Sequence, residues 1–216
     1  YRFPEKDFAD DLSLAVEEAL SLGIKLAARH SENRSHSNNV SDKEIIAKWI
    51  KGFESAKRRI IQGTYSLVEC FLNGLAWDYI QSVGESSLIS ANARKRLQDT
   101  TSVSIRDKMI KYPRDIFGKE PTVGQYLMDT AKPFRDSLMH PSPFSAPEKF
   151  GGYDKLEKIY GIKWEVVSKT LDDLIKYIDN LVTIGNSSMV EPVWLPDLRG
   201  AANKAIQADA FGAADF

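Results

Sequence analysis

Three polar side chains stand close together in one short segment and could act on a phosphate ester. Arg135 and Asp136 are followed, after three residues, by His140, and Pro133 and Pro141 bracket the segment. A guanidinium offers a planar fork of hydrogen-bond donors that fits phosphate oxygens, and an imidazole exchanges protons near neutral pH. The segment therefore contains the groups needed to bind a phosphate and to move a proton beside it.

The spacing of these residues on a helix determines how they can cooperate. Positions five apart, such as Arg135 and His140, diverge by ~140° around a helix axis, so the two side chains can flank a phosphate at the helix end. Asp136 and His140 are four apart and share a face, so the carboxylate can hold one imidazole nitrogen. Pro141 disfavours helical backbone at His140, which predicts that the helix ends there.

The segment from Arg135 to His140 resembles the R-x4-6-H motif of the HEPN superfamily, in which a polar residue commonly follows the arginine. Upstream, Glu69-Cys-Phe-Leu-Asn73 is similar to the long bundle helix that precedes the motif in several HEPN families. The resemblance implies an RNA-cleaving homodimer, a toxin or an effector of prokaryotic defence, with an antitoxin or a defence-system protein as a further partner. Glu69 and Asn73 would support the site from inside the bundle, although a buried amide that only satisfies its neighbours is an equal interpretation of Asn73.

The chemistry expected of such a site needs no metal and no cofactor. His140 would act as general acid and base towards a ribose 2′-hydroxyl and the leaving 5′-oxygen, and Arg135 would stabilise the charge that develops on the phosphate. Asp136 would orient the imidazole. Because the nucleophile belongs to the substrate, DNA should not be cleaved.

A second interpretation gives the same residues no catalytic role. Arg135 is then a solvated helix residue and His140 a helix-terminal one favoured by the macrodipole. The chain would be a non-catalytic dimeric bundle that binds RNA, a nucleotide or a protein. It could also be one part of a larger effector.

Two basic clusters are candidate RNA contacts. Their members carry cationic side chains on segments with helical periodicity: Lys57, Arg58, Arg59, Arg94, Lys95 and Arg96, with Arg106, Lys108 and Lys111 next. On amphipathic helices, however, such charges more commonly form only the solvated face.

The elements that must position these residues are helical. Apolar residues recur at three-to-four spacing, and this predicts helices over 8–29, 42–82, 87–97, 104–111, 122–140 and from 155 or 164 to 184. A kink is expected near Gly63, a break or fresh start at Pro133, and a turn from Tyr112-Pro113 onwards. We expect an all-α helical bundle with two long antiparallel helices over 1–184, and a tail of uncertain structure over 185–216.

Composition excludes several other classes of protein. The 216 residues carry 29 Lys and Arg against 30 Asp and Glu, a formal net charge of -1, which excludes a globally basic coat protein for nucleic acid. The single cysteine, Cys70, excludes an internal disulfide framework, and its place in an apolar stripe favours a core residue over a nucleophile. No apolar run approaches the ~20 residues that span a bilayer, so we expect a cytoplasmic protein with no membrane partner.

Overall fold

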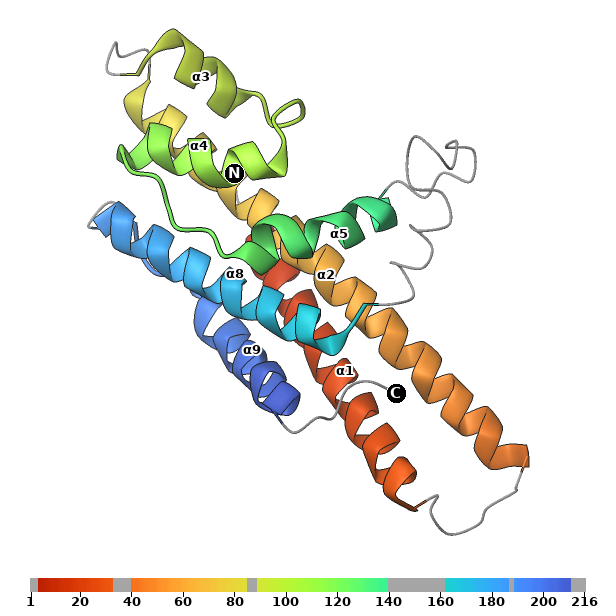
Figure 1. Ribbon diagram of the computed structural model, residues 1–216. Helices are drawn as coiled ribbons and strands as arrows, with labels where there is room; N and C mark the ends of the chain where they lie inside the picture. The colour runs from red at the N-terminus through yellow and green to blue at the C-terminus, as the bar shows by residue number, and fades with distance from the viewer. Residues whose placement is uncertain (1–3, 33–39, 85–88, 140–161, 187–188, 211–216) are drawn as a thin grey trace, which may run out of the picture.

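The computed structural model of the chain describes residues 4–32, 40–84, 89–139, 162–186 and 189–210. Helices account for most of this part of the chain, and no strand occurs within it. The expected all-α bundle is therefore confirmed. Figure 1 shows two long helices lying side by side, with the shorter helices packed around one half of the longer one.

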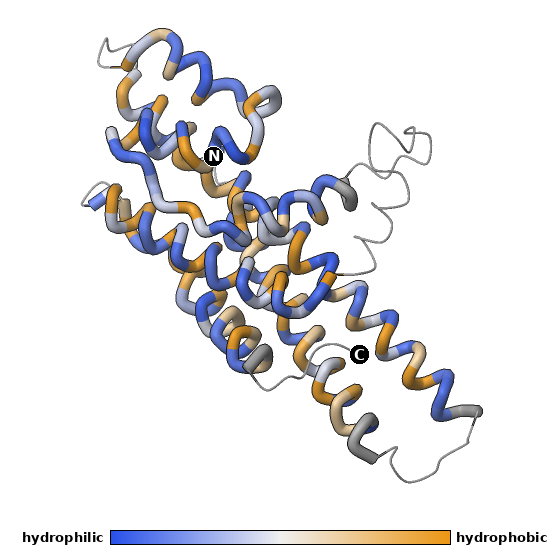
Figure 2. The backbone as a smooth tube through the Cα atoms, viewed as in Figure 1, coloured by the Kyte–Doolittle hydropathy of each residue, from blue (hydrophilic) through white to orange (hydrophobic). Residues whose placement is uncertain are grey.

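The two long helices are antiparallel neighbours. α1 runs over Glu5–Glu32 and α2 over Val40–Val83, and their facing apolar residues form the largest part of the core. Figure 2 shows hydrophobic and hydrophilic stretches alternating along both, as expected of helices that bury one face. α2 continues as one unbroken helix through Gly63, where we expected a kink.

The last part of the chain adds two helices to the same core. α8 runs over Trp164–Gly185, and α9 over Leu195–Ala210 packs against both α1 and α8. The Trp164 indole N–H donates to the Ala205 carbonyl at 3.2 Å and joins α8 to α9. Much of the tail that the sequence left open is therefore a core helix, buried through Trp194 and five small or branched residues, Leu195, Leu198, Ala201, Ala202 and Ala205.

Two short helices cover the C-terminal half of α2. α3 spans Ala91–Gln98 and α4 spans Ile105–Phe117, so α4 runs through Pro113, where a turn was expected. A proline inside a helix leaves the carbonyl four residues earlier without its N–H donor. Here the hydroxyl of Tyr177 in α8 donates to that carbonyl, Met109 O, at 2.9 Å. α4 instead ends at Gly118, whose φ of 72° suits a residue without Cβ.

The segment that carries Arg135 starts later than the sequence indicated. Residues 122–124 are not helical; a π-helix, η1, spans Tyr126–Thr130, and α5 follows over Lys132–Met139. Pro133 is the second residue of α5. Of the two alternatives expected there, a break or a fresh start, the structure has a fresh helical segment. The two pieces pack against α2 and α8.

Candidate functional site

Arg135 lies at the junction between α5 and the middle of α2. Its Nη2 forms an ion pair with Glu69 Oε2 at 3.8 Å, and its Nη1 donates to Asp136 Oδ1 at 3.0 Å. The guanidinium carbon lies 5.9 Å from the centre of the Tyr65 ring, within the range of a cation–π contact. The Arg135 side chain is 20% exposed, so it is held by α2 but can still be reached from solvent.

Arg135 belongs to a chain of alternating charges that links three helices. Lys108 of α4 donates to Glu69 Oε1 at 2.5 Å and to the Thr100 carbonyl at 2.6 Å. At the other end, Lys132 donates to Asp136 Oδ2 at 2.5 Å. We call Lys108, Glu69, Arg135, Asp136 and Lys132 the charge chain. Three cations and two carboxylates leave it one positive charge in excess.

The charge chain changes from buried to exposed along its length. The Lys108 side chain is fully buried, whereas the side chains of Lys132 and Asp136 are 31% and 39% exposed. Burial of an ammonium is costly unless a carboxylate and hydrogen bonds compensate for the lost water, and Glu69 and Thr100 provide these contacts. The Lys108 end therefore fixes the chain to the core, and the Lys132 end presents it to solvent.

Asp136 uses both carboxylate oxygens on cations of its own helix. Burial alone would raise the pKa of its carboxyl, but the hydrogen bonds from Lys132 and Arg135 outweigh burial and hold that pKa below its ordinary value. Asp136 is therefore ionised at neutral pH. Its expected role in orienting His140 stays a prediction, because His140 lies outside the described residues.

η1 is fixed in place by residues from α8 and α2. Asp173 Oδ2 accepts from the backbone N–H groups of Tyr126 at 2.8 Å and Leu127 at 3.2 Å, which caps the start of the π-helix. A Cβ on Gly124 would lie 2.0 Å from the Asp173 carboxyl carbon, so only glycine lets this carboxylate approach. η1 leads directly into α5, and its anchoring therefore sets where Arg135 lies.

A buried tyrosine holds the other side of η1. The Tyr65 hydroxyl donates to the Leu127 carbonyl at 2.5 Å, and the residue is 1% exposed. Burial, followed by the charge of Asp136, raises the pKa of this hydroxyl well above its ordinary value. Tyr65 therefore remains protonated and serves as a fixed donor, while its ring contacts Arg135.

The basic cluster on α2 is not presented as one surface. Lys57 is buried; its ammonium donates to the Ile162 carbonyl at 2.5 Å and pairs with Glu54 at 2.7 Å. Arg58 is half-buried. Arg59 is exposed but pairs with Glu18 of α1 at 2.6 Å. Lys57 therefore serves packing, and the other two stay predicted RNA contacts with part of their surface covered.

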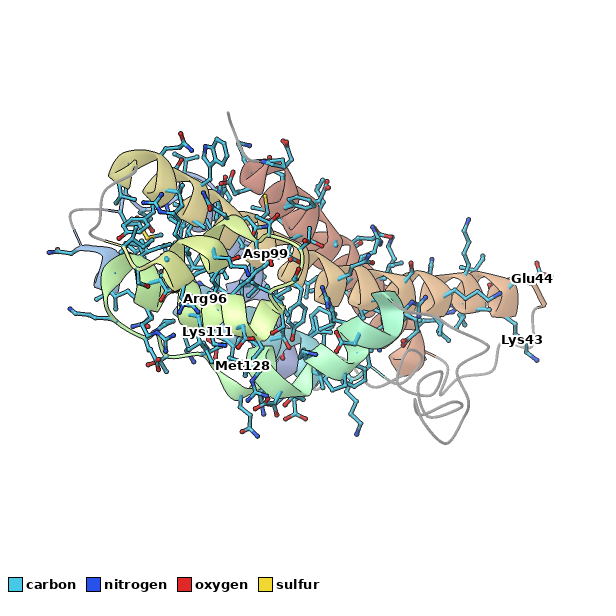
Figure 3. The ribbon with its side chains drawn as sticks, turned by 90° about the horizontal axis from the view of Figure 1, so that it is seen from above. Lys43, Glu44, Arg96, Asp99, Lys111 and Met128 are labelled. Atoms are coloured by element: carbon cyan, nitrogen blue, oxygen red, sulfur yellow. The ribbon has the colours of Figure 1, made fainter. Side chains whose placement is uncertain are left out.

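The basic cluster on α3 lies at the end of the molecule opposite the start of α2. Figure 3 shows Arg96 there, with Lys43 at the far end of α2. Arg96 pairs with the half-buried Asp115 at 2.7 Å, whereas Arg94 is half-buried and Lys95 is exposed. Of this cluster, Lys95 keeps the freest access to a ligand in solution.

The two supporting residues proposed on α2 have different surroundings. Glu69 contacts Arg135 and Lys108, so the structure joins it to the candidate site. Asn73, one turn later, lines a small cavity of about 140 Å³ with residues that include Trp77 and Leu97. Its buried Oδ1 accepts no hydrogen bond from the described part of the chain. Asn73 is thus set apart from the charge chain.

Three residues of the site were not recognised from the sequence as part of it. Lys132 carried a usable signal, because it lies four residues before Asp136 on the same helical face. Lys108 had been grouped with surface cations, and its burial became visible only with α2 and α4 in place. Tyr65 offered no signal beyond its place in the apolar stripe of α2.

Comparison with known proteins gives no relative: no family model, no curated protein and no solved structure matches this chain. Among the helices that the structure describes, none is both long and apolar enough to cross a lipid bilayer.

Proposed function

We propose that this chain is a metal-independent endoribonuclease of the HEPN type, with Arg135 as the phosphate-binding group and His140 as the general acid/base. One observation supports this most: Arg135 is held by Glu69 and Asp136 in a charge chain with one positive charge in excess, and it keeps solvent access. Such a guanidinium is already held in position, and a phosphate can reach it from solvent.

The reaction proposed is attack by the ribose 2′-oxygen on the adjacent phosphorus. His140 removes the 2′-hydroxyl proton, the new O2′–P bond forms, and the P–O5′ bond breaks. The leaving 5′-oxygen takes up a proton, and the products are a 2′,3′-cyclic phosphate and a 5′-hydroxyl end. Arg135 stabilises the negative charge that builds on the non-bridging oxygens.

A homodimer forms part of the proposal for a chemical reason. One imidazole cannot conveniently reach both the attacking and the leaving oxygen on opposite sides of phosphorus, and a second copy of the chain would supply the other. In this proposal the protein works on cytoplasmic RNA as a toxin or defence effector, and an antitoxin or defence-system partner controls it.

The proposal is tested with the purified full chain, a labelled single-stranded RNA and DNA of the same sequence, both in EDTA. We expect RNA cleavage and intact DNA. Arg135→Ala and His140→Ala should each reduce cleavage at least 100-fold, the order of effect that oxyanion stabilisation and general acid/base catalysis contribute.

The matched control is Arg199→Ala. The Arg199 guanidinium also joins two carboxylates, Asp179 at 2.8 Å and Glu191 at 3.0 Å, but Arg199 lies in α9, where no cleavage is proposed. This variant should cleave RNA as the wild type does. Circular dichroism checks that all three variants fold.

Two results would overturn the assignment. Cleavage that survives in both Arg135→Ala and His140→Ala removes these residues from catalysis. A wild-type chain that binds RNA or a protein without cleaving RNA identifies the non-catalytic bundle instead. In that bundle, the ion pair of Arg135 with Glu69 only joins α5 to α2.

A further inference from the structure

Two cations of α5 converge on a single carboxylate at the exposed end of the charge chain. Lys132 Nζ contacts Oδ2 of Asp136 at 2.5 Å, and Arg135 Nη1 contacts Oδ1 at 3.0 Å. Each cation thus uses a different oxygen of the same anion. A phosphodiester also has two anionic, non-bridging oxygens on one central atom, and it could take the same two contacts.

This arrangement differs from an ordinary helical ion pair of the same spacing. In α1, Lys6 contacts Asp10 at 2.6 Å, also four residues apart and in the same order, and no second cation contact to Asp10 is present in the described part of the chain. Such exposed pairs contribute little to stability. The arginine that follows Lys132 on the same face is what makes the α5 pair a two-point anion site.

The exposure of Asp136 distinguishes it from other carboxylates that bridge cations. Asp115 lies between Arg96 and Arg114, but its side chain is only 9% exposed, so a phosphate in solution has little access to its place. The Asp136 side chain is 39% exposed and can turn towards water. Its departure would leave Lys132 and Arg135 without the carboxylate that they share, while Arg135 keeps its ion pair with Glu69.

We propose that Lys132 and Arg135 form a two-cation clamp for an RNA backbone phosphate, and that Asp136 is an internal anion that occupies the clamp until the phosphate displaces it. This rests on the proposed function and names Lys132 as a further substrate-binding residue. Asp136 thereby restrains the site: weakly bound anions do not displace it, whereas a polyanion with several phosphate contacts does.

The test measures binding separately from cleavage. The probe is a 2′-O-methyl RNA oligonucleotide, which carries the phosphates of RNA but lacks the free 2′-hydroxyl, so it cannot be cleaved by the proposed reaction. Its affinity for the 216-residue chain is measured by fluorescence anisotropy at several salt concentrations. Each lost phosphate contact should lower the steepness of the salt dependence by about 0.7 for a single strand.

Three variants and one control are compared, and two of the variants should change RNA affinity in opposite directions. Lys132→Gln should weaken binding about fivefold to tenfold and flatten the salt dependence, whereas Asp136→Asn should tighten binding severalfold because the competing anion is gone. Lys132→Arg, which keeps the charge, should bind almost as the wild type. Lys6→Gln removes the matched exposed cation of α1 and should change neither quantity.

Each other outcome rejects a defined part of the proposal. If Lys132→Gln binds like Lys6→Gln, or the wild type does not bind the probe, the clamp is wrong. If Asp136→Asn binds no tighter, Asp136 is not the internal anion. If Lys132→Gln cleaves RNA normally and its binding is unchanged, the clamp is rejected and the proposed nuclease function is retained. The expected binding changes in a chain that cleaves no RNA would leave the clamp standing and reject the nuclease.

Discussion

The region between α1, α8 and α9 and the region between α2, α4 and α5 are built from opposite kinds of contact. The first is packed mainly with apolar side chains, and its polar links are the indole hydrogen bond from Trp164 to Ala205 and partly exposed ion pairs such as Arg199 with Asp179. The second contains five charged side chains, among them the fully buried Lys108. Aliphatic contacts stabilise through area and do not specify one partner, whereas a buried charge must meet a particular carboxylate. The proposed function of the α5 region rests on this buried charge lying next to side chains that solvent can reach.

The largest expected effect tests the aliphatic region. Leu198 of α9 is fully buried, so Leu198→Ala should lower the free energy of unfolding by about 3 kcal/mol. The charge chain is untouched, so the RNA cleavage rate per folded molecule should not change at a temperature where the variant is folded. Urea unfolding and a cleavage assay measure the two quantities.

The control for Leu198→Ala is Val193→Ala. Val193 is 78% exposed, and its removal should cost no more than about 0.5 kcal/mol. Loss of cleavage in a stable Leu198→Ala variant would contradict the separation of the two regions.

The next effect tests the charged region through its buried end. Glu69→Gln leaves the Lys108 ammonium without a carboxylate, and we expect a loss of about 2 kcal/mol, below the full cost of a broken buried pair because Glu69 is partly exposed. The same change removes the ion pair that joins Arg135 to α2. Unfolding and RNA cleavage should therefore both be affected, in contrast to Leu198→Ala.

Two variants control this result. Glu18→Gln breaks the Glu18–Arg59 pair, in which both side chains are about half exposed, and should cost less than about 1 kcal/mol. Replacing both Glu69 and Lys108, by Gln and Met, removes the buried charge itself and should recover much of the lost stability. A double variant as unstable as the sum of its parts would show that the pair does not act as a unit.

A third prediction concerns the anchor that places α5. Alanine at Gly124 would bring its Cβ to 2.0 Å from the Asp173 carboxyl carbon, so either the carboxylate turns away and its hydrogen bonds to η1 are lost, or η1 shifts. We expect a loss of about 1 to 2 kcal/mol and weaker RNA cleavage, since Arg135 follows η1 in the chain. Circular dichroism during thermal unfolding gives the stability, and the cleavage assay gives the effect on the site.

The matched glycine is Gly200 of α9. A Cβ there would meet nothing within 4 Å, and alanine in an open helical position should raise stability by about 0.4 to 1 kcal/mol. Equal behaviour of Gly124→Ala and Gly200→Ala would rule out the close approach of Asp173 as the anchor of η1.

The sequence predicted the elements that depend on local pattern. Apolar spacing gave α1 and α2 almost to their ends, and the resemblance led to Glu69 as a residue near Arg135. α9 was missed although its signal was present, because Trp194, Leu198 and Ala202 recur at helical spacing and a proline stands near the start. Because many residues of this segment are alanines, its apolar and polar faces differ little in hydrophobicity, and the helical pattern was not recognised.

Other features depend on contacts between distant segments and could not be predicted locally. Pro113 indicated the end of a helix, but α4 continues through it. The hydroxyl of Tyr177 in α8 donates to the Met109 carbonyl, which the proline leaves without an N–H donor. Lys108 was interpreted as a surface cation, since a lysine is buried only where another element provides a carboxylate. In both cases the decisive partner lies far along the chain.

The smallest expected effect concerns acid. The pKa of Asp136 is lower in the folded chain than in an unfolded one, so its ionised form favours folding above the ordinary carboxyl pKa. That contribution is lost as pH falls through the folded-state pKa, below about pH 4. Because the side chain is 39% exposed, solvent screening keeps the effect under about 1 kcal/mol. Urea unfolding of the wild type and Asp136→Asn should therefore differ at pH 6 and converge towards pH 2. If the difference in unfolding free energy between the two proteins grew on acidification, Asp136 would not be held as an anion by Lys132 and Arg135. The α5 region would then not differ from the aliphatic region at its exposed side.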